Sequence, residues 1–189
     1  TAHHNFRRFT ARKLYIHNCG HALLAYRGWL KSHEYGWQAL ADPEVKEFLF
    51  AGWEESAAAV AVEYAADIDW LRRHMQDLFV RFGNRALGDT VFRLGRDPIR
   101  KLGPTDRLVA PAKLAAAGGT VPTYLAGGVA AAFCFAPDDD PVARQLQQRL
   151  AAEGLPALLQ DICDIDPASA LGGAVCKQYE KLHNEDNRQ

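Results

Sequence analysis

The chain has 189 residues, of which 48% are hydrophobic, and this is enough to bury the core of a single domain. Its formal net charge of −1 excludes a global field that would attract nucleic acid or an anionic membrane. No apolar run approaches the roughly 20 residues that are needed to span a bilayer.

Helix signals follow one another along the chain. Thr10 is placed to cap a first helix that carries KLYIHNCGHALLAY, and residues 70–82 predict another helix that ends at Gly83. Asp is a good N-cap and Pro suits the first helical position, so each Asp-Pro pair marks a helix start. These pairs stand at 42–43, 97–98, 140–141 and 166–167. Long helix-forming runs follow the first, third and fourth pairs, and Gly154 is expected to end the run after the third.

Strand signals are scarce. Only VFRL at 91–94 and AAFCF at 131–135 are candidates, and both are short and compatible with a helix. The sequence therefore predicts an all-α fold.

The cysteines point to a reducing compartment. Four are present, without a Cys-x-x-Cys pair, at positions 19, 134, 163 and 176. We therefore expect reduced thiols in a cytoplasmic protein, without a metal site, although four cysteines in a secreted chain could form disulfides. We expect no signal peptide, and the first residue, Thr1, fits a fragment of a longer protein.

The run KLYIHNCGHALLAY contains a Lys-x4-Asn-x2-His pattern at Lys13, Asn18 and His21. On an α-helix these positions fall within an arc of roughly 140°, so all three side chains could face one cleft. Alone, the pattern is equally compatible with a solvated lysine, a surface amide and a half-buried histidine. His17 is interpreted as a packing or surface histidine at the far edge from Lys13, and Cys19 as a small buried residue.

A second polar region extends from residue 93 to residue 107 and contains five basic but only two acidic residues. The planar guanidinium group of arginine suits phosphate, and lysine adds a point charge. Pro98 should start a new helix, so we expect a helix end that meets a helix start near Arg96. The alternative is a solvated basic segment with intrahelical ion pairs.

Three segments together resemble a known family. RKLYIHNCGHALLAY, RFGNRALGDTVFRLGRDPIRKLGPTDRL and GGVAAAFCFAPDDDP are similar to the C-terminal half of the polyol-specific long-chain dehydrogenases, and within them to the mannitol-1-phosphate 5-dehydrogenases. The resemblance runs from about Lys13 to Tyr179. It implies a multi-helical domain with a fold like the C-terminal domain of 6-phosphogluconate dehydrogenase, and an NAD-linked hydride transfer without a metal.

The resemblance also implies roles for single residues. Lys13 would be the general base, Asn18 the donor that stabilises charge on the substrate oxygen, and His21 a contact that orients substrate and base. A lysine base needs its pKa lowered toward the working pH, which burial can achieve. The substrate and its phosphate would be bound by basic residues of the second polar region: Arg93, Arg96, Arg100 and Lys101.

The domain that holds the cofactor is not expected in this chain. No Gly-x-Gly-x-x-Gly motif is present. We therefore expect residues 1–12 to be an extension from an N-terminal Rossmann domain of the same protein, 13–183 the helical substrate domain, and 184–189 a polar tail. NAD would be bound mainly by the N-terminal domain, and the isolated chain would lack turnover. The expected partners are that domain and a polyol phosphate, with no nucleic acid or membrane.

Two alternatives remain open. A mannitol 2-dehydrogenase or a hexuronate reductase of the same superfamily would share the Lys, Asn and His pattern. A non-catalytic helical interaction domain could carry the pattern by descent without using it.

Overall fold

A computed structural model describes residues 2–186, with side chains from Phe6 to Asn184. In this part of the chain the regular elements are helices joined by turns and loops, with no strand beyond one isolated bridge between Tyr35 and Thr90, so the predicted all-α fold is confirmed. In chain order the helices are α1 (Ala2–Ala11), π-helix η1 (Arg12–Asn18), α2 (Cys19–Leu30), α3 (Gly36–Ala41), α4 (Pro43–Glu63), α5 (Ile68–Phe82), 3-10 helix η2 (Arg85–Leu87), α6 (Val91–Gly95), α7 (Pro98–Lys101), α8 (Val109–Ala117), α9 (Thr123–Phe133), α10 (Pro141–Glu153), α11 (Leu155–Cys163) and α12 (Ala170–Asp186).

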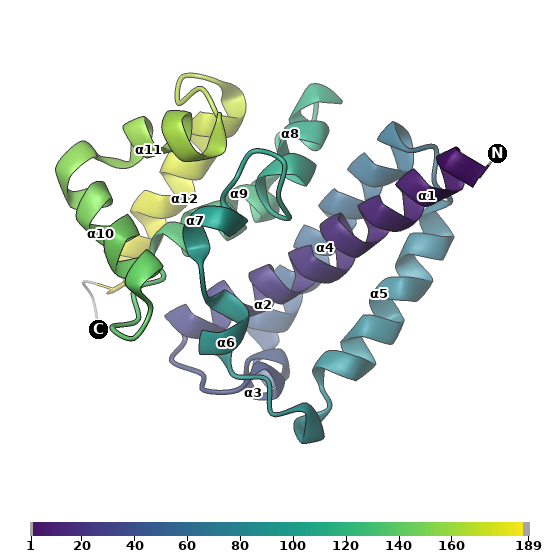
Figure 1. The fold of residues 1–189 in the computed structure, drawn as a ribbon, viewed down its shortest axis with the longest axis horizontal. Helices are drawn as coiled ribbons and strands as arrows, with labels where there is room; N and C mark the ends of the chain where they lie inside the picture. Colours follow the sequence, from purple (N-terminus) through teal and green to yellow (C-terminus); the bar gives the residue numbers. More distant parts are fainter. Residues whose placement is uncertain (1, 187–189) are drawn as a thin grey trace.

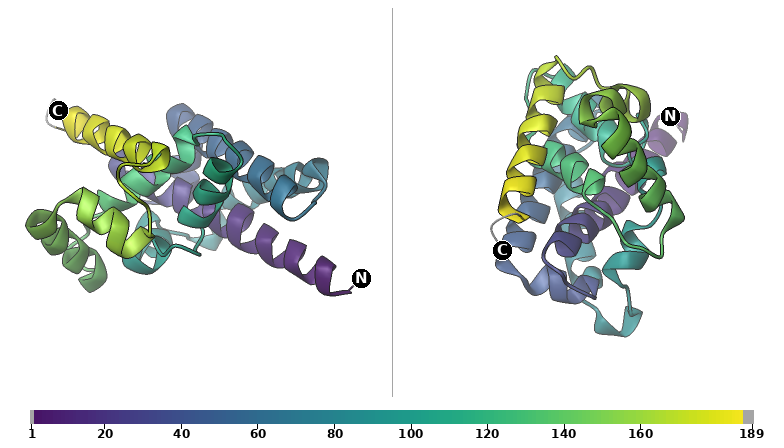
Figure 2. Two further views of the ribbon diagram at one scale, coloured as in Figure 1. Left: turned by 90° about the horizontal axis from the view of Figure 1, so that it is seen from above. Right: turned by 90° about the vertical axis from the view of Figure 1, so that its left-hand side faces the viewer.

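The first three helices form one unbroken rod that crosses the molecule (Figure 1). Its N-terminal end, α1, projects beyond the other helices (Figure 2). The prediction that Thr10 caps the motif helix is therefore wrong. Thr10 lies inside the rod, and its hydroxyl donates to the carbonyl of Phe6 one turn earlier, because the helix has already begun at Ala2.

Two of the four Asp-Pro pairs act as predicted, at the starts of α4 and α10. Asp42 and Asp140 accept hydrogen bonds from the first backbone N–H groups of α4 and α10. Asp97 precedes α7 but does not cap it, because its backbone is left-handed, with φ of 61°. Asp166 lies in a turn before α12, and Gly154 ends α10 with φ of 80°, as expected.

Neither strand candidate forms a strand, since 91–94 lies in α6, and 131–133 ends α9 while 134–135 follows it. In the polar tail predicted at 184–189, α12 continues to Asp186, and residues 187–189 lie outside the described part of the chain. Among residues 2–186 no helix is both long enough and apolar enough to cross a membrane.

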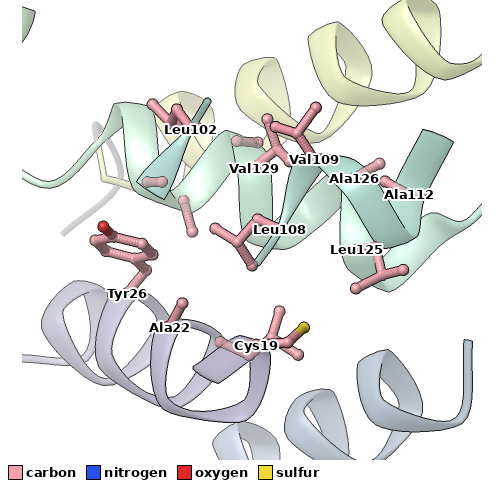
Figure 3. Packing of buried hydrophobic residues seen from close by; sticks show 14 of the residues in the cluster. Cys19, Ala22, Tyr26, Leu102, Leu108, Val109, Ala112, Leu125, Ala126 and Val129 are labelled. Carbon is pink, nitrogen blue, oxygen red and sulfur yellow. The ribbon is translucent and has the colours of Figure 1, made fainter. Parts of the chain in front are cut away.

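The core forms where α2 packs against α4, α6 and α9. Figure 3 shows Cys19, Ala22 and Tyr26 of α2 facing the buried residues of α8 and α9. Small residues permit this close packing. At Gly20 a Cβ atom would collide with the indole ring of Trp53, which is fully buried on α4. The start of α2 is thereby pressed onto α4.

The contact at Gly20 leads to a stability prediction. Gly20→Ala should lower the free energy of unfolding by about 1–3 kcal/mol, because the rigid Trp53 ring has no free space to move into. In thermal unfolding this corresponds to a loss of roughly 2–10 °C in Tm. Gly173→Ala on α12 is the matched control, since nothing lies near its added methyl, and it should stabilise by about 0.5–1 kcal/mol. Equal effects of the two substitutions would contradict the proposed clash.

Candidate active site

Lys13 and Asn18 of the Lys-x4-Asn-x2-His pattern lie on the π-helix η1, whereas His21 lies on the α-helix α2 that follows it. The N–H of Cys19, just after η1, donates to the carbonyl of Leu14 five residues earlier. Residues five apart are therefore one hydrogen-bonded turn apart, which brings Asn18 closer to the face of Lys13 than an α-helix would. Such widened turns are rare and often occur at functional sites.

Two side chains of α4 hold this π-helix in place. The indole N–H of Trp53 donates to the carbonyl of Ile16 at 2.8 Å, and the hydroxyl of Ser56 donates to the carbonyl of Tyr15 at 2.6 Å. Both side chains are fully buried. Carbonyls of the irregular turn thus find buried donors outside their own helix, which lowers the cost of the distorted backbone.

Lys13 and His21 lie on either side of His17. The amino group of Lys13 is 3.4 Å from Nδ1 of His17, and the rings of His17 and His21 meet edge to face, with centroids 5.0 Å apart. The sequence interpretation that placed His17 at the far edge from Lys13 is therefore wrong. Residues four apart lie on one helix face, and this spacing was the signal that could have identified His17.

Helix α5 forms the opposite side of the site. Phe82 stacks on His21 with ring centroids 4.0 Å apart, and His74 lies 6.1 Å from the His17 ring. Among the described residues, no group of three or more histidine, cysteine or carboxylate side chains could hold a metal ion, so the three neighbouring histidines do not form a metal site.

The two histidines next to Lys13 are neutral at ordinary pH. Burial, followed by the charge of Lys13, lowers the pKa of His17 to about 4. Burial, followed by His17 and Lys13, lowers the pKa of His21 to about 3. His21 can therefore offer a hydroxyl group a hydrogen bond, as donor or acceptor, without carrying a charge.

The other two residues of the pattern remain accessible. Lys13 is exposed, so the described residues do not supply the desolvation that a lysine base needs. Asn18 is half-buried, and its side-chain amide makes no hydrogen bond within the part of the chain that the structure describes. Both groups are thus available to a ligand.

The second polar region, the basic segment at 93–107, is divided between two helices as the position of Pro98 predicts. Helix α6 ends at Gly95 and α7 starts at Pro98. Arg93 and Arg100 are exposed but paired, with Asp89 and Asp97 respectively. Arg96 is exposed between the two helices, its guanidinium lies 5.9 Å from the Phe92 ring centre, and it meets no carboxylate among the described residues. Of the three arginines, Arg96 is therefore the most available to an anion.

Lys101 differs from the arginines. Its side chain is only 4% exposed, and its amino group donates to the carbonyl of Arg96. Burial, followed by the charges of Arg107 and Arg100, lowers the pKa of Lys101 to about 8. The sequence predicts Lys101 as a substrate or phosphate contact, whereas the structure buries its amine, which hydrogen-bonds the backbone between α6 and α7.

A hydrogen bond and an electrostatic interaction connect α2 with the basic residues between 93 and 107. The hydroxyl of Tyr26 on α2 donates to the carbonyl of Gly95 at 2.9 Å. Arg107, largely buried and paired with Asp106 at 2.7 Å, lowers the pKa values of both His21 and Lys101 through its charge. Sequence reasoning counted Arg107 among the basic residues but did not select it, because nothing in the pattern shows that its charge acts on both His21 and Lys101.

The lowered histidine pKa values predict a pH-dependent stability. An unfolded histidine titrates near 6.5, so between about pH 6.5 and 4 the unfolded chain binds more protons than the folded one, and the free energy of unfolding falls as the pH falls. We expect Tm to drop by roughly a few degrees per pH unit in this window, since both sites are partly screened by solvent. The double variant His17→Asn/His21→Asn, measured by the same thermal scans, should show a flatter dependence. An unchanged slope would contradict the assignment.

Comparison with known proteins places the chain in a family. The family model described as "Mannitol dehydrogenase C-terminal domain" matches residues 5–183. The mannitol-1-phosphate 5-dehydrogenase of Thermoanaerobacter pseudethanolicus is 34% identical over 92% of this chain and 45% of its own length. That of Bacillus licheniformis is 37% identical over 86% of this chain and 43% of its own length. The chain thus spans less than half of the relatives that it matches.

A solved structure shares the fold. The Pseudomonas fluorescens mannitol 2-dehydrogenase, in a ternary complex with NAD and D-mannitol, superposes with a TM-score of 0.77 over 94% of this chain and 39% of that one. The identity is 22%, so this likeness concerns the arrangement of the helices.

Proposed function

The chain belongs to the mannitol dehydrogenase C-terminal domain family, and from this premise we propose that it is the substrate-binding half of an NAD-dependent mannitol-1-phosphate 5-dehydrogenase. Such an enzyme interconverts mannitol 1-phosphate and fructose 6-phosphate. The observation that carries the proposal is a short stretch of widened helix with an accessible amine and an accessible amide, followed directly by α2 with a neutral imidazole.

These three groups match what the oxidation of a secondary alcohol requires. Lys13 takes the hydroxyl proton, and Asn18 donates a hydrogen bond to the oxygen as negative charge develops on it. His21 orients the hydroxyl through a neutral ring that is fixed by its stacking on Phe82. A neutral histidine adds no charge that would oppose proton transfer to Lys13.

NAD is the implied cofactor and accepts the hydride when bound. Residues 2–186 are helical and offer no strand, turn and helix to hold a pyrophosphate, so they do not fit a dinucleotide by themselves. We propose that a dinucleotide-binding domain outside this chain, in the same polypeptide, binds NAD. In the assembled site that domain would also cover Lys13 and supply its desolvation.

The proposed base can be tested in the polypeptide that contains both domains. Lys13→Ala should lower kcat for mannitol 1-phosphate with NAD by about 100-fold or more, because general base catalysis typically contributes that much. Lys31→Ala, at the lysine that directly follows α2 and pairs with Glu44, is the matched control and should retain activity. The isolated 189 residues should show no turnover. Activity of the isolated chain, or of Lys13→Ala at the level of the control, would refute the proposal.

For the phosphate we propose Arg96 as the main contact, with Arg93, Arg100 and Lys101 around it. Arg96→Ala should raise KM for mannitol 1-phosphate about tenfold or more, because a charge-assisted contact contributes about 1.5–3 kcal/mol. KM for unphosphorylated mannitol should stay unchanged. Arg149→Ala on α10, which removes an arginine paired with Glu153 and Asp161, is the control. A change below about twofold for Arg96→Ala would exclude this residue. Fructuronate, assayed alongside, tests the hexuronate alternative.

A further inference from the structure

The side chain of Lys13 makes its hydrogen bond within the described residues to His17. The two side chains lie one turn apart on η1, and Nζ of Lys13 is 3.4 Å from Nδ1 of His17. A lysine ammonium only donates hydrogen bonds, so when Lys13 is protonated Nδ1 of His17 must carry the lone pair. This arrangement requires a neutral His17 ring.

The surroundings of His17 keep its ring neutral and fixed. Rings pack against it from two elements, since His21 lies on α2 while Phe82 and His74 lie on α5. The titratable and charged groups that face it are Lys13, His21, His74 and Arg81, and no carboxylate is among those that shift its pKa. With a pKa of about 4, His17 remains an acceptor throughout the neutral range.

We propose that His17 is a positioning residue for the general base: its Nδ1 accepts a hydrogen bond from the Lys13 amine and holds it on the face that carries Asn18 and His21. The inference rests on the proposed role of Lys13. During alcohol oxidation the amine gains a proton, and the resulting ammonium is stabilised by the lone pair of His17. His17 does not contact the reacting atoms; it acts through Lys13.

A measurement on the chain itself tests the contact without any activity. The rate at which acetic anhydride labels the Lys13 amine, followed by mass spectrometry as a function of pH, reports the midpoint of its deprotonation. His17→Leu removes the acceptor of the ammonium form, so the midpoint should fall relative to that of the parent chain. His17→Asn keeps an acceptor oxygen near the position of Nδ1 and should restore most of the shift. Lys31 in the same digest is the internal control and should not change.

The catalytic consequence is measured in the two-domain polypeptide. His17→Leu should lower the plateau of kcat roughly fivefold to twentyfold, with KM nearly unchanged, and should move the rising limb of the pH profile to lower pH. His17→Asn should lie close to the parent. A His17 that merely packs would lower Tm or the plateau equally in both variants and would leave the limb and the labelling midpoint in place, and that result would overturn the inference.

The role of Lys13 as base and the role of His17 as positioning residue can be refuted independently. If Lys13→Ala retains activity, the proposed base is wrong, whatever His17 does. If Lys13→Ala abolishes activity while His17→Leu leaves the midpoint and the pH profile unchanged, the base stands and the positioning role is overturned.

Discussion

The geometry of the whole site depends on two buried hydrogen bonds from α4 to the π-helix. Trp53 and Ser56 supply donors to successive carbonyls of a turn that an isolated helix would not adopt. Their partners Ile16 and Tyr15 lie between Lys13 and Asn18, so the bonds fix the stretch of backbone that carries the candidate base and its neighbours. Because Gly20 presses onto the same indole ring, packing and hydrogen bonding converge on a single contact.

The polar residues of the site differ in charge and in exposure to solvent. The histidines around Lys13 are kept neutral by burial and by neighbouring positive charge, whereas Lys13 itself faces solvent. A lysine in water is a poor base at neutral pH, so this face is suited to chemistry only when something covers it. The arrangement fits one wall of a cleft, which agrees with a chain that spans less than half of its relatives.

The sequence predicts what local rules determine. The caps at Asp42 and Asp140 were predictable because capping depends only on residues that are neighbours in sequence. The break at Pro98 was predictable from the missing N–H of proline. The π-helix could not be predicted, since its stabilising donors lie 37 and 41 residues away. The buried amine of Lys101 likewise depends on tertiary packing. His17 was within reach of sequence reasoning, because its spacing of four from Lys13 places the two side chains on one face.

The unbroken rod of α1, η1 and α2 gains a rotational offset from its wide turn. One additional residue in a helical turn shifts the faces before and after it by roughly 100° relative to each other. Phe9 and Arg12, ahead of the shift, pack on Trp70 of α5, whereas α2 behind it turns its small residues toward α4, α6 and α9. The π-turn thus rotates the faces of the helix, so that a single continuous helix packs against two sets of neighbours that lie in different directions. Lys13 lies where this rotation occurs.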